Sequence, residues 1–142
     1  MKTINFIDAR DDRFKYDDKQ AQNASLDKLQ LIMECSLLVN PQFDFTSTHI
    51  LMTIKSNNNR VLDYSVLLTY KIDGWGNFVS NASSEEIKAT PEVRRMIEIS
   101  VGFVRGALYI REKGTPVENF NLPIIDIDGL IKRTVIIRPE KK

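Results

Sequence analysis

The chain has 142 residues, 42% of them hydrophobic, and this size and composition suit one domain, residues 1–142, with a core of its own. Twenty lysines and arginines stand against nineteen acidic residues, so the net charge of +1 creates no strong field toward nucleic acid. The single cysteine, Cys35, excludes an internal disulfide framework and a thiol-rich zinc site, and it favours a reducing compartment.

The beginning of the chain carries no visible targeting signal. Residues 1–8 lack the apolar run of a signal peptide. Residues 93–110, the longest apolar-rich segment, include four charged side chains, whereas a membrane span needs ~20 nearly uncharged residues. We therefore expect a cytoplasmic protein without membrane insertion. Residues 1–27 are the hardest to assign, and we expect from them one further strand or a short helix.

Alternating apolar and polar residues predict three antiparallel strands. Residues 28–40 alternate up to Pro41, alternation resumes over residues 50–54, and residues 61–72 form a long third strand. The asparagines of residues 56–59 predict a tight hairpin connection, because Asn tolerates positive φ. Residues 74–76, Gly-Trp-Gly, interrupt the alternation, and we favour a bulge after which Phe78 continues the strand.

Capping signals predict the helices. Ser83 and Glu86 have the spacing of a capping box that opens a single turn. Thr90 followed by Pro91 is typical of a helix start, and Gly114 of a helix end, so we expect a long helix over residues 91–113. This helix is predicted to pack on one face of the sheet.

The long helix is apolar around most of its circumference, and one sheet face cannot cover all of it. We expect a homo-oligomer, a dimer or tetramer, in which the flanking faces of the helix meet another subunit. The alternative is that the N-terminal segment or the last helix covers them. The predicted interface residues are Ile99, Gly102, Phe103, Gly106 and Ile110.

Residue groups that would indicate an enzyme are missing from the sequence. His49 is the only histidine, so a triad or a histidine metal cluster has no second imidazole. Cys35 lies on the apolar side of its strand, where a thiol is inert. Asp126 and Asp128 are more typical of caps than of a two-carboxylate site, and no phosphate-binding loop is present. We expect no catalytic activity, no metal and no cofactor.

The end of the chain carries a resemblance to a known family. Residues 120–131, Phe-Asn-Leu-Pro-Ile-Ile-Asp-Ile-Asp-Gly-Leu-Ile, follow the long helix after Gly114-Thr115 and resemble the closing segment of the SecB preprotein-export chaperones, with the proline displaced by one position. Pro91 and Arg94 match the Pro-x-x-Arg of that family, and residues 70–78 resemble its third-strand ending. The resemblance covers roughly residues 29–133.

The resemblance implies an α+β fold: an antiparallel sheet of three to four strands, the long helix on one face, and a short final helix that Asp126 can cap. Residues 134–142 form a tail that could pair as an extra edge strand. The implied function is an ATP-independent chaperone that binds extended apolar segments of unfolded proteins. The alternative is an adaptor or antitoxin-type chaperone dedicated to one cognate protein.

Candidates for lining the client groove are apolar residues near the glycine pair and in the closing segment, with core packing as the alternative role of each: Trp75, Phe78, Phe120, Leu122, Ile125 and Ile127. SecB proteins are acidic and use an acidic sheet surface to engage the SecA motor. This chain is close to neutral and has no acidic cluster on its strands, so SecA is not favoured as a partner.

Overall fold

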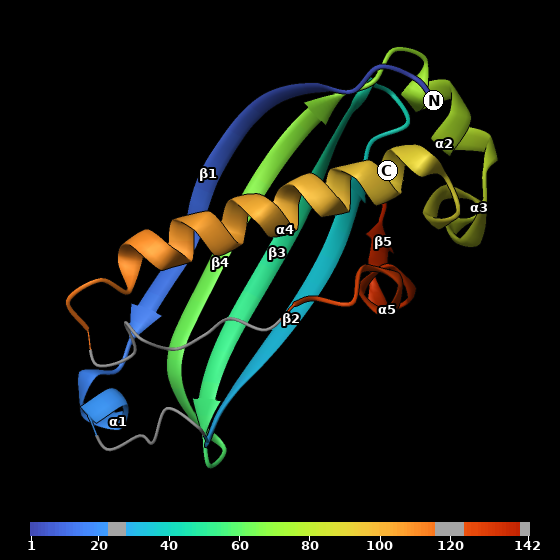
Figure 1. The fold of residues 1–142 in the computed structure, drawn as a ribbon. Coiled ribbons are helices and arrows are strands. Elements are labelled where there is room, and N and C mark those ends of the chain that lie inside the picture. The colour runs from blue at the N-terminus through green and yellow to red at the C-terminus, as the bar shows by residue number, and fades with distance from the viewer. Residues whose placement is uncertain (23–27, 116–123, 140–142) are drawn as a thin grey trace.

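The computed structural model describes residues 1–22, 28–115 and 124–139. These residues form two layers, a five-stranded sheet and a long helix, α4, that crosses one face of it (Figure 1). The fold is α+β, as the sequence predicts. The elements in chain order are β1 (Asn5–Tyr16), α1 (Asp18–Gln22), β2 (Leu29–Val39), β3 (Phe45–Ser56), β4 (Asn59–Lys71), α2 (Trp75–Asn81), α3 (Ser84–Lys88), α4 (Pro91–Arg111), α5 (Ile127–Arg133) and β5 (Val135–Ile137).

The sheet has the strand order β1-β4-β3-β2-β5 and is mixed, because β5 runs parallel to β2 while the other neighbours are antiparallel. The three predicted strands correspond to β2, β3 and β4. The connection between β3 and β4 places Asn57 and Asn58 at φ 50° and 70°, which confirms the predicted tight turn. Five strands rather than three or four result from the two additional edge strands, β1 and β5.

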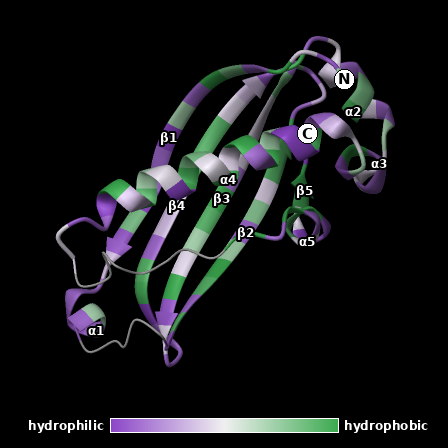
Figure 2. Ribbon diagram, viewed as in Figure 1, coloured by the Kyte–Doolittle hydropathy of each residue, from purple (hydrophilic) through white to green (hydrophobic). Residues whose placement is uncertain are grey.

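The hydrophobic core lies between the sheet and α4. Alternate residues of β4 point toward the helix, and their apolar side chains continue across β3 and β2 (Figure 2). The opposite face of the sheet, which we call the outer face, is mixed, as the sequence predicts for β4. The largest fully buried side chains on the helix side of β4 are Leu62, Tyr64, Leu68 and Tyr70.

The N-terminal residues form both a strand and a short helix, where we expected only one of them. Phe6 and Phe14 of β1 pack edge-on against Tyr70 and Tyr64, with ring centroids 5.9 and 5.8 Å apart. Arg111, at the end of α4, stacks on the Phe14 ring at 4.8 Å and forms an ion pair with Asp11 of β1. These contacts tie an otherwise charged strand to the core.

The predicted bulge at residues 74–76 is wrong: the strand ends and α2 begins there, so Phe78 is helical. Gly74 has φ 79°, a conformation that favours glycine. The carboxylate of Asp44 accepts hydrogen bonds from the backbone N–H of Gly74 at 3.1 Å and of Gly76 at 2.9 Å. A Cβ on Gly76 would lie 2.9 Å from two carbonyl oxygens of the 41–43 loop, so the close approach requires glycine.

Asp44 gives the start of α2 a pH dependence. Its pKa is held below the usual value because the N–H groups of Gly76 and Gly74 bond the charged form. A lowered folded-state pKa contributes stability that is present above the unfolded value near 4 and is lost as the pH falls through the folded value. We expect the unfolding free energy of the wild type, measured with urea between about pH 5 and 2.5, to approach that of Asp44→Asn. A gap between the two proteins that stays constant over this range would contradict the assignment.

Helix α4 has the predicted start, and it ends within two residues of the predicted end. Thr90 is the N-cap and accepts from the N–H of Val93 at 3.2 Å, and Gly114 has φ 78° just beyond the end. In the middle of the helix, Ser100 enters the core. Its hydroxyl oxygen lies 2.6 Å from that of Thr48 on β3 and 2.8 Å from that of Tyr70 on β4. Buried hydroxyl groups therefore bond the helix to both β3 and β4.

The end of the chain folds back onto the helix and the sheet. Asp126 occupies the predicted N-cap position of α5, without a side-chain cap hydrogen bond. Arg94 on α4 pairs with Asp128 on α5, so two segments that carry the family resemblance meet in space. The predicted extra edge strand forms as β5, and Arg138 beyond it donates to the carbonyl oxygens of Val79 and Ala82, both at 2.7 Å.

Candidate polypeptide-binding site

Four of the six predicted client-binding residues lie within the described residues, and all four pack on the core. Trp75 is 2% exposed and contacts Phe78, with ring centroids 5.2 Å apart, at the start of α2. Ile127 is half-buried at the start of α5, and Ile125 is half-buried two residues before it. Phe120 and Leu122 lie outside the described residues. A role of these side chains in client binding stays a prediction, and the described four belong to two different elements.

The feature best suited to hold an extended chain is the edge of β2 that faces away from β3. All eleven residues of β2 pair with β3, but only Ser36, Leu37 and Leu38 pair with β5. Within the described residues, no strand pairs with this edge from Leu29 to Cys35. A depression of about 530 Å³ runs beside it, lined by six consecutive β2 residues and by Arg133 and Val135. Seven residues of strand offer an edge of roughly 23 Å.

The two edges of the sheet differ in how they resist an added strand. At the other edge, β1 has two register shifts and six charged residues among its twelve, and both features discourage pairing with another chain. The open part of β2 is regular in its pairing with β3, contains no proline, and carries one charged residue, Glu34. Backbone donors and acceptors along an edge of this kind bind extended peptides by strand addition.

Apolar side chains on the outer face border the β2 edge. Ile32 is 39% exposed, and Val135 and Ile137 of β5 are 58% and 45% exposed. Ile137 pairs with Leu38, and both residues line a second depression of about 310 Å³. None of these residues was predicted as a site residue. The alternation of β2 showed Ile32 on its polar side, but only the pairing of β5 with Ser36–Leu38 places Val135 and Ile137 on the same face of the sheet.

The predicted interface residues of α4 lie together on the side of the helix away from the sheet. Phe103 is 40% exposed, Ile110 is 68% exposed, and Ile99 is half-buried. Gly102 and Gly106 are exposed, and within the described residues no atom apart from the adjacent residues and the backbone of α4 itself lies within 4 Å of where a Cβ on either would be. We call these five residues the α4 stripe. Their assignment to a subunit interface stays a prediction.

The ionisable groups near the core are arranged for structure. Burial raises the pKa of the Cys35 thiol to about 11, so it remains protonated and unreactive at neutral pH. His49 Nε2 lies 3.0 Å from an oxygen of Asp12, and Ser65 donates to that same oxygen at 3.2 Å. The serine thus bonds the carboxylate rather than the imidazole, which is not the order of a catalytic triad. Across residues 1–22, 28–115 and 124–139, no group of metal-ligating side chains is found.

No model of a known protein family matches the chain, and no curated protein matches it. One solved structure with a similar course of the chain is a Mycobacterium tuberculosis SecB-like chaperone, in complex with a ChAD peptide from the HigA1 antitoxin. The identity is 12%, the TM-score is 0.47, and the alignment covers 87% of this chain and 91% of that one.

None of the helices in the described residues is both long and apolar enough to cross a bilayer.

Proposed function

We propose that this protein is an ATP-independent chaperone that binds extended apolar segments of unfolded polypeptides along the β2 edge. The observation that carries the proposal is the regular, almost uncharged edge from Leu29 to Cys35 beside a depression of about 530 Å³. A bound segment would add a strand next to β2, in line with β5. Its backbone would make the sheet hydrogen bonds, and Ile32 and Val135 would contact its side chains.

Aggregation of a thermally destabilised model protein, followed by light scattering without ATP, tests this function. The wild type is expected to suppress aggregation at about one molecule per client. Ile32→Lys places a charge beside the edge, and losing ~1–2 kcal/mol of apolar contact corresponds to needing roughly 5–30 times more protein. Ile7→Lys is the matched control, because Ile7 is 50% exposed on the β1 edge. No suppression by excess wild-type protein, or equal losses in the two variants, would remove the proposal.

The alternative is an adaptor of the same fold that serves one cognate protein. The short open edge favours it, because seven residues accommodate a single segment, whereas wrapping a general client needs several sites. Purification of the tagged chain from its native host, followed by mass spectrometry, separates the two. One stoichiometric partner supports the adaptor, and a broad set of clients supports the general chaperone. Engagement of SecA is not part of either proposal.

The proposal includes self-association through the α4 stripe, as a dimer or tetramer. Leaving Phe103 and Ile110 exposed forfeits ~25 cal/mol for each Å² of apolar surface that a second copy would cover. We expect light scattering coupled to size-exclusion chromatography to give a multiple of the 16.3 kDa chain mass for the wild type and the chain mass itself for Phe103→Asp. Phe43→Asp, at a phenylalanine that is 56% exposed elsewhere, should keep the wild-type mass. A wild-type monomer at micromolar concentration would contradict self-association.

A further inference from the structure

A second surface, at the hairpin end of the outer face, gathers positive charge from three strands. Arg13 and Lys15 lie on β1, Lys55 lies at the end of β3, and Arg60 lies at the start of β4. We call these four residues the cationic end. Asp63 lies among them, and Asp17 and Asp18 also line the depression, so the four cations of the cationic end outnumber these three carboxylates by one. The depression beside them measures about 750 Å³.

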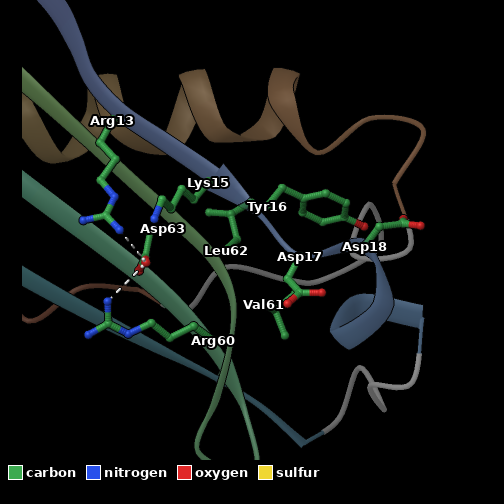
Figure 3. A pocket seen from close by; sticks show the side chains of 9 residues that line it. All are labelled: Arg13, Lys15, Tyr16, Asp17, Asp18, Arg60, Val61, Leu62 and Asp63. Atoms are coloured by element: carbon green, nitrogen blue, oxygen red, sulfur yellow. Dashed lines mark hydrogen bonds and ion pairs between the residues drawn. The ribbon is translucent and has the colours of Figure 1, made fainter.

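Asp63 holds the two arginines in place. Its side chain is 6% exposed, and it accepts from the Thr53 hydroxyl at 2.9 Å and from Arg60 at 3.2 Å, with Arg13 at 3.9 Å on the other side (Figure 3). One carboxylate cannot occupy the donors of two guanidinium groups. The side chains of Arg13 and Arg60 are 46% and 62% exposed, so both also present donors to the solvent.

The two lysines of the cationic end do not serve the fold in this way. Lys55 stands directly opposite Arg60 in the β3–β4 pairing. Like charges at directly opposed strand positions are destabilising. Lys15 is opposite Asp63, yet no ion pair of Lys15 is found within the described residues. These lysines add to the positive potential without satisfying a buried group.

We propose that the cationic end docks an acidic peptide segment of a partner protein, through Asp or Glu carboxylates. Guanidinium groups bind carboxylates through paired, charge-assisted hydrogen bonds, and the pre-positioned arginines favour this geometry. Asp17 and Asp18 line the far side of the same depression (Figure 3). They would repel the continuous negative charge of a nucleic-acid backbone, whereas separate carboxylates on a peptide can avoid them.

The depression beside this surface shares no lining residue with the depression beside the β2 edge, and Lys55, which pairs with Gln30 of β2, lies one strand inward from that edge. A partner docked at the cationic end and a segment held at the edge could therefore occupy one protein molecule together. The proposal does not depend on the chaperone function.

The test uses a fluorescein-labelled peptide in which three glutamates alternate with glycines, and fluorescence anisotropy at low ionic strength. The wild type is expected to bind, and Lys15→Gln with Lys55→Gln should weaken binding by about fivefold to tenfold. Lys113→Gln with Lys132→Gln is the matched control, because it removes the same charge from exposed positions on other elements and should change affinity by less than about twofold. Circular dichroism melting checks that both double variants are folded.

Three results would overturn the proposal. They are absence of binding of this alternating peptide by the wild type, equal weakening in the two double variants, and tighter binding of a hexanucleotide with the same loss of affinity in the Lys15 and Lys55 variant. The Lys15 and Lys55 variant is expected to suppress client aggregation as well as the wild type does. A failure of the acidic-peptide proposal is therefore distinguishable from a failure of the chaperone proposal.

Discussion

N-methylation of alternate amides in an apolar heptapeptide is expected to weaken its binding by roughly 10-fold to 2,000-fold when the methylated amides face β2, and by less than about threefold when they face away. In an added strand, every second backbone N–H points at the host edge, and the others point away. Three lost hydrogen bonds at ~0.5–1.5 kcal/mol each amount to ~1.5–4.5 kcal/mol. Fluorescence anisotropy with the two labelled, phase-shifted peptides gives both affinities.

The two methylated peptides control for each other in composition and stiffness, because both carry the same number of methyl groups. Equal weakening of the two would mean that the methyl groups act through shape or flexibility. No weakening of either would mean that side chains alone hold the peptide. Either result would refute strand addition at Leu29–Cys35.

Trp75→Ala is expected to lower the unfolding free energy by ~3–5 kcal/mol, the usual cost of removing a fully buried aromatic side chain. Trp75 is 2% exposed, and its indole N–H has no hydrogen-bond partner within the described residues. Trp75→Phe should therefore cost less, because it removes this unpaired donor along with part of the ring. Urea denaturation measures both variants, and Phe43→Ala, at an exposed phenylalanine, should change stability by no more than ~0.5 kcal/mol.

The same variants decide whether Trp75 also lines a client groove. We expect Trp75→Phe to bind the unmodified apolar heptapeptide with wild-type affinity under conditions in which it is fully folded. A loss of affinity without a loss of folded protein would support the client-binding role of Trp75 that the sequence suggested.

The central strands and helix ends could be predicted because their signals are local. The alternation of residues 61–72 follows from one covered sheet face, and Thr90, Pro91 and Gly114 mark the ends of α4 by their own backbone preferences. Strand β1 could not be predicted with the same ease. Its charges hide the alternation, and its pairing with β4 depends on contacts such as Phe14 with Tyr64, 50 residues apart in sequence.

Glycines 74 and 76 show how a local signal can mislead. A glycine pair after a strand is compatible with a bulge or a turn, and the outcome here depends on Asp44, which bonds both N–H groups from 30 and 32 residues away. The candidate site at the β2 edge could not be predicted from the sequence for a related reason. Among the described residues, the open part of the β2 edge ends where β5 begins, opposite Ser36, and no pattern within β2 records that. The α4 stripe, in contrast, could be found from helical periodicity alone.

The buried hydroxyl of Ser100 limits how α4 can move on the sheet. Sliding the helix by one turn, ~5.4 Å, would separate Ser100 from both Thr48 and Tyr70 and leave polar groups unpaired in the core. These hydrogen bonds therefore hold the helix in one position on the sheet. If two copies join through Phe103 and Ile110, this position sets the relative orientation of their β2 edges. The spacing between two bound polypeptide segments is then a fixed property of the assembly.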